Sequence, residues 1–190
     1  MVDTEVASRI LAAAYTCFTR SGVRSTTMDD IASRAEVSRP TVYNHVGSKD
    51  VVFRQVLEVL LNEALEAARI SARRPAALQD RILKVVECKL AVSARIRADS
   101  PEHATDFIGV DAALSRDLIR QFDSRLAEIL AHEIGLDYPA ANDRDIAEIL
   151  LVVCRGFEAE LLDNVVFARR LYRTVELIVA GLASDNGDRT

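Results

Sequence analysis

The sequence predicts an all-α protein. Its 190 residues include 5% aromatic residues, no tryptophan, seven glycines and four prolines, and Ala, Leu, Val, Ile, Glu, Asp and Arg dominate the rest. This composition is typical of helical proteins. Apolar side chains also recur at helical spacing along most of the chain. A hydrophobic content of 49% suffices for one good core, or for a small module fused to a larger one.

The first helix is predicted over residues 4–21, because apolar residues recur there at helical spacing. These residues are Val6, Ile10, Ala14 and Phe18. Gly22 is expected to end the helix as a left-handed cap, a conformation that glycine adopts without steric cost.

Two short helices are predicted next. Thr27 begins the first, since Thr27 and Asp30 have the spacing of a capping box. Ser38 caps the second, which places Pro40 in the first turn, where a backbone N–H has no partner within the helix. A tight turn at Glu36 joins the two into a helix-turn-helix. Its inward residues are Ile31, Ala32, Val37 and Val42, which we expect to pack on Ile10 and Phe18.

The rest of the chain is predicted to be helical, beginning with a helix that Ser48 caps and that ends near Ser71. The segment RRPAA joins it to a second helical region. The helices predicted there span about residues 78–96, 102–108, 112–134, 143–162 and 167–183. We therefore expect a three-helix domain with a helix-turn-helix at residues 1–50 and a helical domain at residues 51–190.

Charge is distributed unevenly along the sequence. The net charge is −5, and residues 1–50 carry six basic and six acidic residues, so the excess lies on residues 51–190. Residues 20–49 carry five basic and three acidic residues, a weak basic patch that does not by itself predict nucleic-acid binding. The acidic N-terminus and the lack of an apolar run of about 18 residues predict a soluble, cytoplasmic protein with no membrane partner. The three cysteines are far apart, which indicates reduced core residues.

The segment ILAAAYTCFTRSGVRSTTMDDIASRAEVSRPTVYNHVGSKDVVFRQVL resembles the N-terminal domain of the tetracycline-repressor (TetR) family of bacterial transcriptional regulators. The matching positions include Phe18, Gly22, Thr27, Ile31-Ala32, Val37-Ser38, Thr41-Val42-Tyr43 and Ser48-Lys49-Asp50. The sequence departs from the family at Glu36, where glycine is frequent, and at Val46, where an aromatic residue is usual. A positive φ at Glu36 would cost about 1 kcal/mol. Beyond Leu57 the resemblance implies only an all-helical ligand-binding and dimerisation domain.

The resemblance implies that the second helix of the motif reads DNA. Arg39 lies in its first turn, where the guanidinium can bond O6 and N7 of guanine; the alternative is an exposed solubilising arginine. Tyr43 and Lys49 match phosphate contacts of the family. Thr27 can cap its helix, contact phosphate, or both, and His45 can contact DNA or pack against the first helix. The full predicted set is Thr27, Ser38, Arg39, Pro40, Thr41, Tyr43, Asn44, His45 and Lys49.

Apolar faces in the C-terminal region predict a dimer interface and an effector pocket. Stripes on the last two helices are too wide for one small core, so two copies are expected to form a four-helix interface. The predicted interface residues are Ile149, Val153, Phe157, Leu161, Leu171, Val175, Ile178 and Leu182. Scarce aromatic fillers favour a mainly apolar cavity over solid packing. Its predicted lining is Val86, Lys89, His103, Phe107, Leu118, Phe122 and Phe157, with surface salt bridges as the alternative for the polar members.

The resemblance thus implies a homodimeric, sequence-specific transcriptional regulator, usually a repressor, that binds a palindromic operator in double-stranded DNA and responds to a small effector. We expect no enzyme activity, no catalytic residues and no cofactor, because no nucleophile with a base, no Gly-rich phosphate loop and no metal cluster is visible. His103 with Glu102 and Asp106 can be read as a metal site, but more often such a group is a solvated helix start. Two alternatives stay open: a ligand-independent DNA-binding adaptor, and an enzyme that uses the C-terminal domain.

Overall fold

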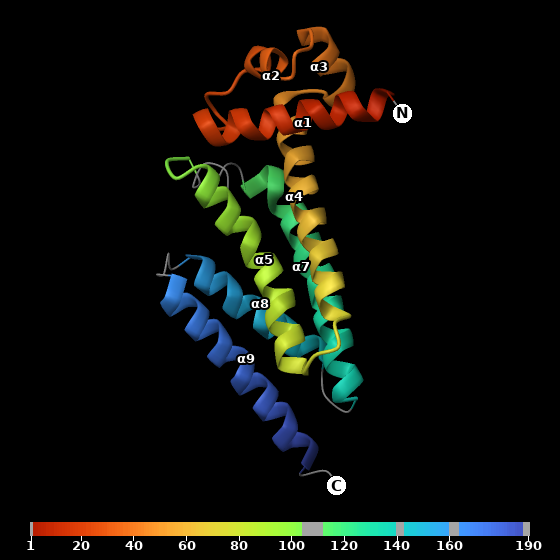
Figure 1. The fold of residues 1–190 in the computed structure, drawn as a ribbon, viewed down its shortest axis with the longest axis vertical. Coiled ribbons are helices and arrows are strands. Elements are labelled where there is room, and N and C mark those ends of the chain that lie inside the picture. Colours follow the sequence, from red (N-terminus) through yellow and green to blue (C-terminus); the bar gives the residue numbers. More distant parts are fainter. Residues whose placement is uncertain (1, 104–111, 140–142, 160–163, 188–190) are drawn as a thin grey trace. The chain divides into compact units, whose positions relative to one another are not determined.

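The computed structural model of the chain describes residues 2–103, 112–139, 143–159 and 164–187. These residues form eight helices and no strand, which confirms the predicted all-α class (Figure 1). The helices are α1 (Val2–Ser21), α2 (Met28–Arg34), α3 (Arg39–Val46), α4 (Lys49–Ala72), α5 (Leu78–Asp99), α7 (Ala112–Asp137), α8 (Asp143–Ala159) and α9 (Asn164–Gly187). None of the described helices combines the length and the apolar character that crossing a membrane requires.

The helix ends differ from the predicted ones mainly at their C-termini. Helix α5 continues to Asp99 rather than residue 96, because the polar last turn remains compatible with a helix until Pro101. The residue before a proline is disfavoured in helical conformation, which explains the end of the helix near Ser100. The helix predicted at 102–108 and the last residues of the one predicted at 143–162 lie largely outside the described residues.

The chain packs as two compact units. The first comprises residues 1–62 and 92–119, and the second comprises residues 63–91 and 120–190. Helices α4, α5 and α7 each contribute to both units. The functional boundary that we expect at residue 50 stays a prediction.

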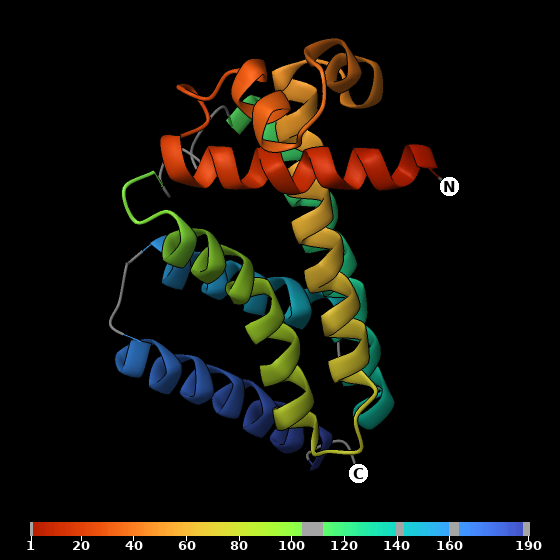
Figure 2. The ribbon, with the colours of Figure 1, turned by 45° about the horizontal axis from the view of Figure 1, so that its top comes forward.

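The first unit is built on a core that α1, α2 and α3 share (Figure 2). Ile31 and Val42 lie fully buried against Ile10 and Phe18, as the sequence predicts. The core residues are Ile10, Ala13, Ala14, Phe18, Val23, Met28, Ile31, Ala32, Ala35, Val42, Val46, Val52, Phe53, Val56, Leu60 and Ile96, with Val37 partly buried against them. Since Ile96 belongs to α5, the core extends well beyond the first 50 residues.

Two polar contacts tie the later helices of this unit to the earlier ones. The Tyr15 hydroxyl donates a hydrogen bond of 2.5 Å to Asp99. Burial, together with the nearby Asp99 carboxylate, raises the pKa of Tyr15 to about 12. The Arg54 guanidinium bonds both carboxylate oxygens of Asp117, at 2.9 and 2.8 Å. Two parallel bonds of this kind fix orientation as well as distance.

The second unit holds α8 and α9 side by side (Figure 1). Leu150 and Cys154 of α8 and Leu171 and Val175 of α9 are buried within the single chain. Charged side chains are buried here as well. Arg81 bonds Glu133 at 2.8 Å and Asp137 at 2.7 Å.

Candidate nucleic-acid interface

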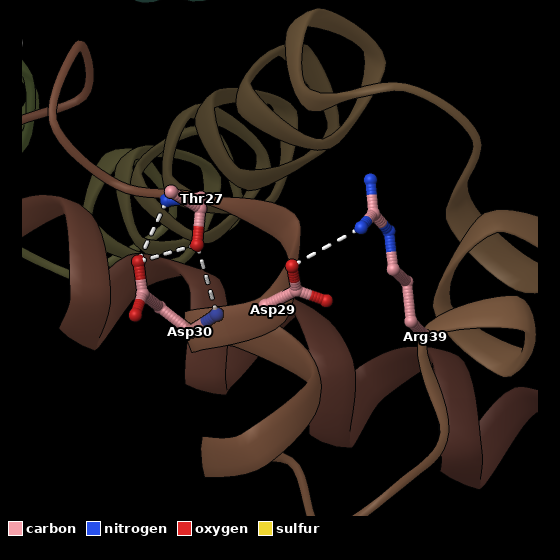
Figure 3. A network of polar contacts seen from close by, with 4 residues as sticks. All are labelled: Thr27, Asp29, Asp30 and Arg39. Carbon is pink, nitrogen blue, oxygen red and sulfur yellow. Dashed lines mark hydrogen bonds and ion pairs between the residues drawn. The ribbon is translucent and has the colours of Figure 1, made fainter.

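The start of α2 is fixed by a reciprocal cap between Thr27 and Asp30 (Figure 3). The Thr27 hydroxyl accepts the Asp30 backbone N–H at 3.2 Å and donates to the Asp30 carboxylate at 2.7 Å. The same carboxylate accepts the Thr27 backbone N–H at 2.8 Å. These bonds from Thr27 lower the pKa of Asp30. Because its only hydroxyl hydrogen is engaged, Thr27 acts here as a helix cap, one of the two roles that the sequence allows.

The turn between α2 and α3 sets the direction of α3 relative to α2. Glu36 has a φ of 54°, in the left-handed region that glycine adopts more readily. Immediately after it, the Val37 backbone N–H donates to the Ala32 carbonyl at 3.1 Å. The backbone is therefore strained at Glu36, where the sequence departs from the family pattern.

Helix α3 begins as predicted. Ser38 is the N-cap: its hydroxyl oxygen accepts the Thr41 backbone N–H at 3.2 Å and lies 2.7 Å from the Thr41 hydroxyl. Pro40 stands in the first turn, where it costs no hydrogen bond. The first turn of α3 contains no acidic residue.

The outward face of α3 carries groups that can bond nucleic acid. Arg39, Tyr43 and Asn44 are exposed, whereas Val42 and Val46 are buried beneath them. The Arg39 guanidinium carbon lies 5.7 Å from the centre of the Tyr43 ring. Arginine forks, phenol hydroxyls and amides are the groups that bond base edges and phosphates. Three of the predicted contacts on α3 are thus exposed, and two of them, Arg39 and Tyr43, lie side by side.

Arg39 also has a partner that the sequence analysis missed. Its Nη1 donates to Oδ2 of Asp29 at 3.1 Å, across the turn between α2 and α3 (Figure 3). A signal for this role exists in the sequence. A capping box needs one acid three residues after Thr27, which is Asp30, so the adjacent Asp29 is not needed for the box, although its charge favours the helix N-terminus.

Two other predicted contacts are engaged within the protein. Lys49 Nζ donates to the carbonyl oxygens of Arg24 at 3.0 Å and Thr26 at 3.1 Å, so it holds the loop between α1 and α2. His45 is half-buried, and its Nδ1 lies 2.8 Å from the Thr41 carbonyl oxygen of its own helix. Contact of either residue with DNA stays a prediction.

The residues predicted to line an effector pocket belong to both units. Val86, Lys89, Phe122 and Phe157 belong to the second unit. Leu118, which is buried, and half-buried His103 belong to the first unit, and Phe107 lies outside the described residues. Two grooves are described, of about 430 and 300 Å³, and none of these residues lines either one. The larger groove, between α7 and α8, is lined largely by charged side chains: Arg120, Asp123, Arg144, Glu148 and Arg155.

Lys89 is the clearest departure among these residues. It is buried and pairs with Asp123 at 3.1 Å and Glu158 at 3.4 Å. The salt-bridge alternative therefore describes Lys89 in this structure, although the pair is buried rather than on the surface. Among the described residues, no group of three or more His, Cys, Asp or Glu is arranged to hold a metal ion.

The predicted dimer residues divide by exposure. Leu171, Val175 and Leu182 are buried within the single chain, and their contact with a second copy stays a prediction. Ile149 is 57% exposed on α8. Val153, Phe157 and Ile178 are half-buried, with the Phe157 ring 5.8 Å from that of Phe167, and Leu161 lies outside the described residues. The sequence analysis missed the exposed apolar residues Val152, Tyr172 and Leu177.

Residues 10–56 match the profile of a family described as "Bacterial regulatory proteins, tetR family". This segment is therefore similar to the domain that the profile describes. Over 65 residues, 34% of this chain, the sequence is 38% identical to YfiR of Bacillus subtilis (strain 168), an uncharacterised HTH-type transcriptional regulator. The matched segment spans 32% of that relative, so the likeness to YfiR concerns about a third of each protein.

Solved structures extend the likeness in fold beyond this segment. A protein of Mesorhizobium loti MAFF303099, described as a TetR-family regulator, has a TM-score of 0.73 at 16% identity, over 95% of this chain and 98% of that one. A transcriptional regulator of Rhodococcus sp. RHA1 has a TM-score of 0.71 at 17% identity, over 92% and 96%. The TetR-family repressor AlkX of Dietzia sp. DQ12-45-1b has a TM-score of 0.57 at 18% identity, over 94% and 95%. At these identities the comparison shows a shared fold.

Proposed function

We propose that this protein is a sequence-specific DNA-binding transcriptional regulator in which α3 is the recognition helix. The observation that carries the proposal is the exposed face of α3, where Arg39, Tyr43 and Asn44 gather without an acidic residue in the first turn. Its helix start is held by the Ser38 cap, so these side chains extend from a rigid element. The similarity of residues 10–56 to the TetR-family profile supports the same function.

We further propose that the protein acts as a homodimer through α8 and α9. The support is an exposed apolar surface formed by Ile149 and Val152 on α8 and by Tyr172 and Leu177 on α9. Large exposed apolar side chains grouped on neighbouring helices are typical of protein interfaces. A two-fold axis would present two copies of α3 to a palindromic operator with half-sites about 34–36 Å apart, or a multiple of that.

Regulation is proposed to be repression that a small effector relieves. Such an effector acts only if it binds the DNA-ready and relaxed states with different affinities. AlkX, which shares the fold, is named a repressor. A ligand-independent DNA-binding adaptor is the second candidate. An enzyme using the C-terminal helices is the third, without a specific observation in its favour.

Selection from a randomised double-stranded DNA library tests the DNA-binding proposal. We expect an enriched palindromic sequence for the wild-type protein. Arg39→Ala should then lose about 1–3 kcal/mol on that sequence, mainly through one base pair of each half-site. Arg34→Ala is the matched control, because Arg34 is an exposed arginine of the neighbouring helix α2. Failure to enrich any sequence at low and moderate salt would contradict the proposal.

A further inference from the structure

Asp29 and Arg39 form an ion pair that joins the two helices of the helix-turn-helix (Figure 3). One carboxylate oxygen, Oδ2, lies 3.1 Å from Nη1 of the guanidinium. The side chains are 65% and 55% exposed, respectively, so both stay accessible to a bound macromolecule. An exposed pair of this kind contributes little to stability, so holding the fold does not explain it.

The local structure of α2 does not require Asp29. Thr27 and Asp30 complete the capping box between themselves. Within the described part of the chain, Arg39 is the only residue that contacts the Asp29 carboxylate through a hydrogen bond or ion pair. The acid therefore has two described roles: its charge favours the N-terminus of α2, in whose first turn it lies, and it pairs with a side chain of the proposed recognition helix.

The Asp29 carboxylate does not occupy the Nε–Nη2 edge of Arg39, and the other neighbour of the guanidinium is Tyr43, whose hydrogen bond raises the pKa of Arg39. A guanidinium offers a side edge, formed by Nε and the far Nη, and this edge matches the two acceptors O6 and N7 of guanine. Asp29 occupies Nη1 alone, and in Figure 3 the Nε and Nη2 atoms extend away from the carboxylate. A guanine can therefore be bonded in a bidentate manner while the ion pair persists.

The charge of Asp29 acts differently on bases and on phosphates. A carboxylate beside the guanidinium offsets much of its positive charge and repels an approaching phosphate. Binding to a neutral base edge depends on paired hydrogen bonds and loses little from this neutralisation. The pair thus weakens the use of Arg39 as a general phosphate anchor while preserving it as a base reader.

We propose that Asp29 is a positioning residue that directs Arg39 to a base pair and limits its binding to the DNA backbone. This inference rests on the proposed function, because it assumes that α3 binds duplex DNA. Asp29 sets specificity, the ratio of operator affinity to affinity for unrelated duplex, rather than total affinity. The partner that the pair recognises is a guanine in the major groove.

The experiment uses the full-length protein, the duplex enriched from a randomised library, its single-base variants, and an unrelated duplex of equal length. Asp29→Asn keeps the shape of the side chain and removes its charge. We expect tighter binding to the unrelated duplex and a specificity ratio that falls about three- to tenfold, with the loss concentrated at the base pair whose preference Arg39→Ala abolishes. A thermal melt of each variant establishes that it is folded.

Two controls separate positioning from general charge. Glu5→Gln removes the negative charge of an exposed side chain on α1 in the same unit. It should change the affinity for all duplexes by the same factor. In an Arg39→Ala background, Asp29→Asn should leave base-pair discrimination unchanged, since a double-mutant cycle isolates the coupling of the two residues.

The inference is overturned if Asp29→Asn alters operator and unrelated duplex equally, as Glu5→Gln does, or if discrimination at the Arg39 base pair stays intact. It is also overturned if Asp29→Asn changes base-pair discrimination as much in the Arg39→Ala background as it does in the wild-type background. The proposed function fails in a distinct way: the wild-type protein then enriches no sequence at all, and both proposals are discarded together.

Discussion

The ammonium of Lys89 lies 3.1 Å from Oδ1 of Asp123, and the two side chains are only 6% and 10% exposed. Glu158 approaches the same ammonium at 3.4 Å, and Arg155 approaches the other oxygen of Asp123 at 3.0 Å. The Lys89 ammonium also lies 5.9 Å from the centre of the Phe122 ring. Two positive and two negative side chains thus lie together in the second unit. Removing one of them takes away an ionic partner of another.

Lys89→Met should destabilise the protein by about 3 kcal/mol, because it removes the buried ammonium from Asp123, a buried carboxylate whose other ionic partner, Arg155, is largely exposed. The measurement is the free energy of unfolding in urea. Lys84→Met is the control, since Lys84 makes an exposed pair with Glu87 on the same helix and should cost less than about 0.5 kcal/mol. The double change Lys89→Met with Asp123→Leu should be less harmful than the sum of the single changes. Equal effects of the two lysine variants would contradict this account.

Ile149→Asp should weaken the proposed dimer without unfolding the chain, because the side chain is 57% exposed on α8. Sedimentation velocity across a range of protein concentrations measures the shift toward monomer. Ile70→Asp provides a control with similar exposure, 62%, on α4. If Ile149→Asp leaves the dimer intact, or if Ile70→Asp dissociates it equally, the α8 surface is not the interface.

Lys49→Met should lower stability by about 1–2 kcal/mol, because the ammonium donates to two backbone carbonyls of the loop between α1 and α2. Thermal unfolding at fixed pH measures the loss. Arg9→Met removes an exposed charge from α1 and should change the melting temperature little. A fully stable Lys49→Met variant with reduced affinity for every duplex would instead indicate that Lys49 serves mainly as a phosphate contact.

The pair between Arg54 and Asp117 should make stability sensitive to acid. Hydrogen bonds from Arg54 hold the pKa of Asp117 well below its usual value of about 3.9. The contribution of this group is therefore complete above about pH 4 and is lost as the pH falls through the lower pKa of the folded state. Asp117→Asn should lower the urea midpoint near pH 7, and the difference from wild type should narrow toward about pH 2. A difference that stays constant across this range would exclude the pair as its source.

Glu36→Gly should stabilise the protein by about 1 kcal/mol, because glycine adopts the φ of 54° without steric cost. Part of the gain is offset by the greater freedom of glycine in the unfolded chain. Glu36→Ala keeps the Cβ atom and should show no such gain. Matching melting temperatures for the glycine and alanine variants would argue against strain at this turn.

The sequence predicted the helix-turn-helix well because its signals are local. The Thr27–Asp30 box, the Ser38 cap and the left-handed Gly22 are each determined by residues within a few positions. The prediction that Arg39 is exposed rested on the same local signals. The partners of Arg39 and Lys49 did not, since Asp29 is ten residues from Arg39 and the carbonyls are 23 and 25 residues from Lys49.

The C-terminal helices show where periodicity stops being informative. The stripe of Leu171, Val175 and Leu182 identifies the apolar face of α9, but it does not tell which surface covers that face. These three residues are buried within the single chain, whereas Tyr172 and Leu177 of the same helix are exposed. Lys89 illustrates the same limit for charge, because its counter-ions come from α7 and α8 rather than from neighbours in sequence.

The position of Ile96 in the first core has a consequence for protein engineering. A hybrid protein made by joining residues 1–50 to the helical body of another protein would leave behind the α4 core residues Val52, Phe53, Val56 and Leu60, and also Ile96 and Asp99 of α5, the latter being the hydrogen-bond acceptor of Tyr15. The transplanted module would then need a replacement for that turn of α5. A transplanted first module should therefore extend through Leu60 and carry over residues 92–99 as a matched insert, so that the graft consists of two sequence segments rather than one.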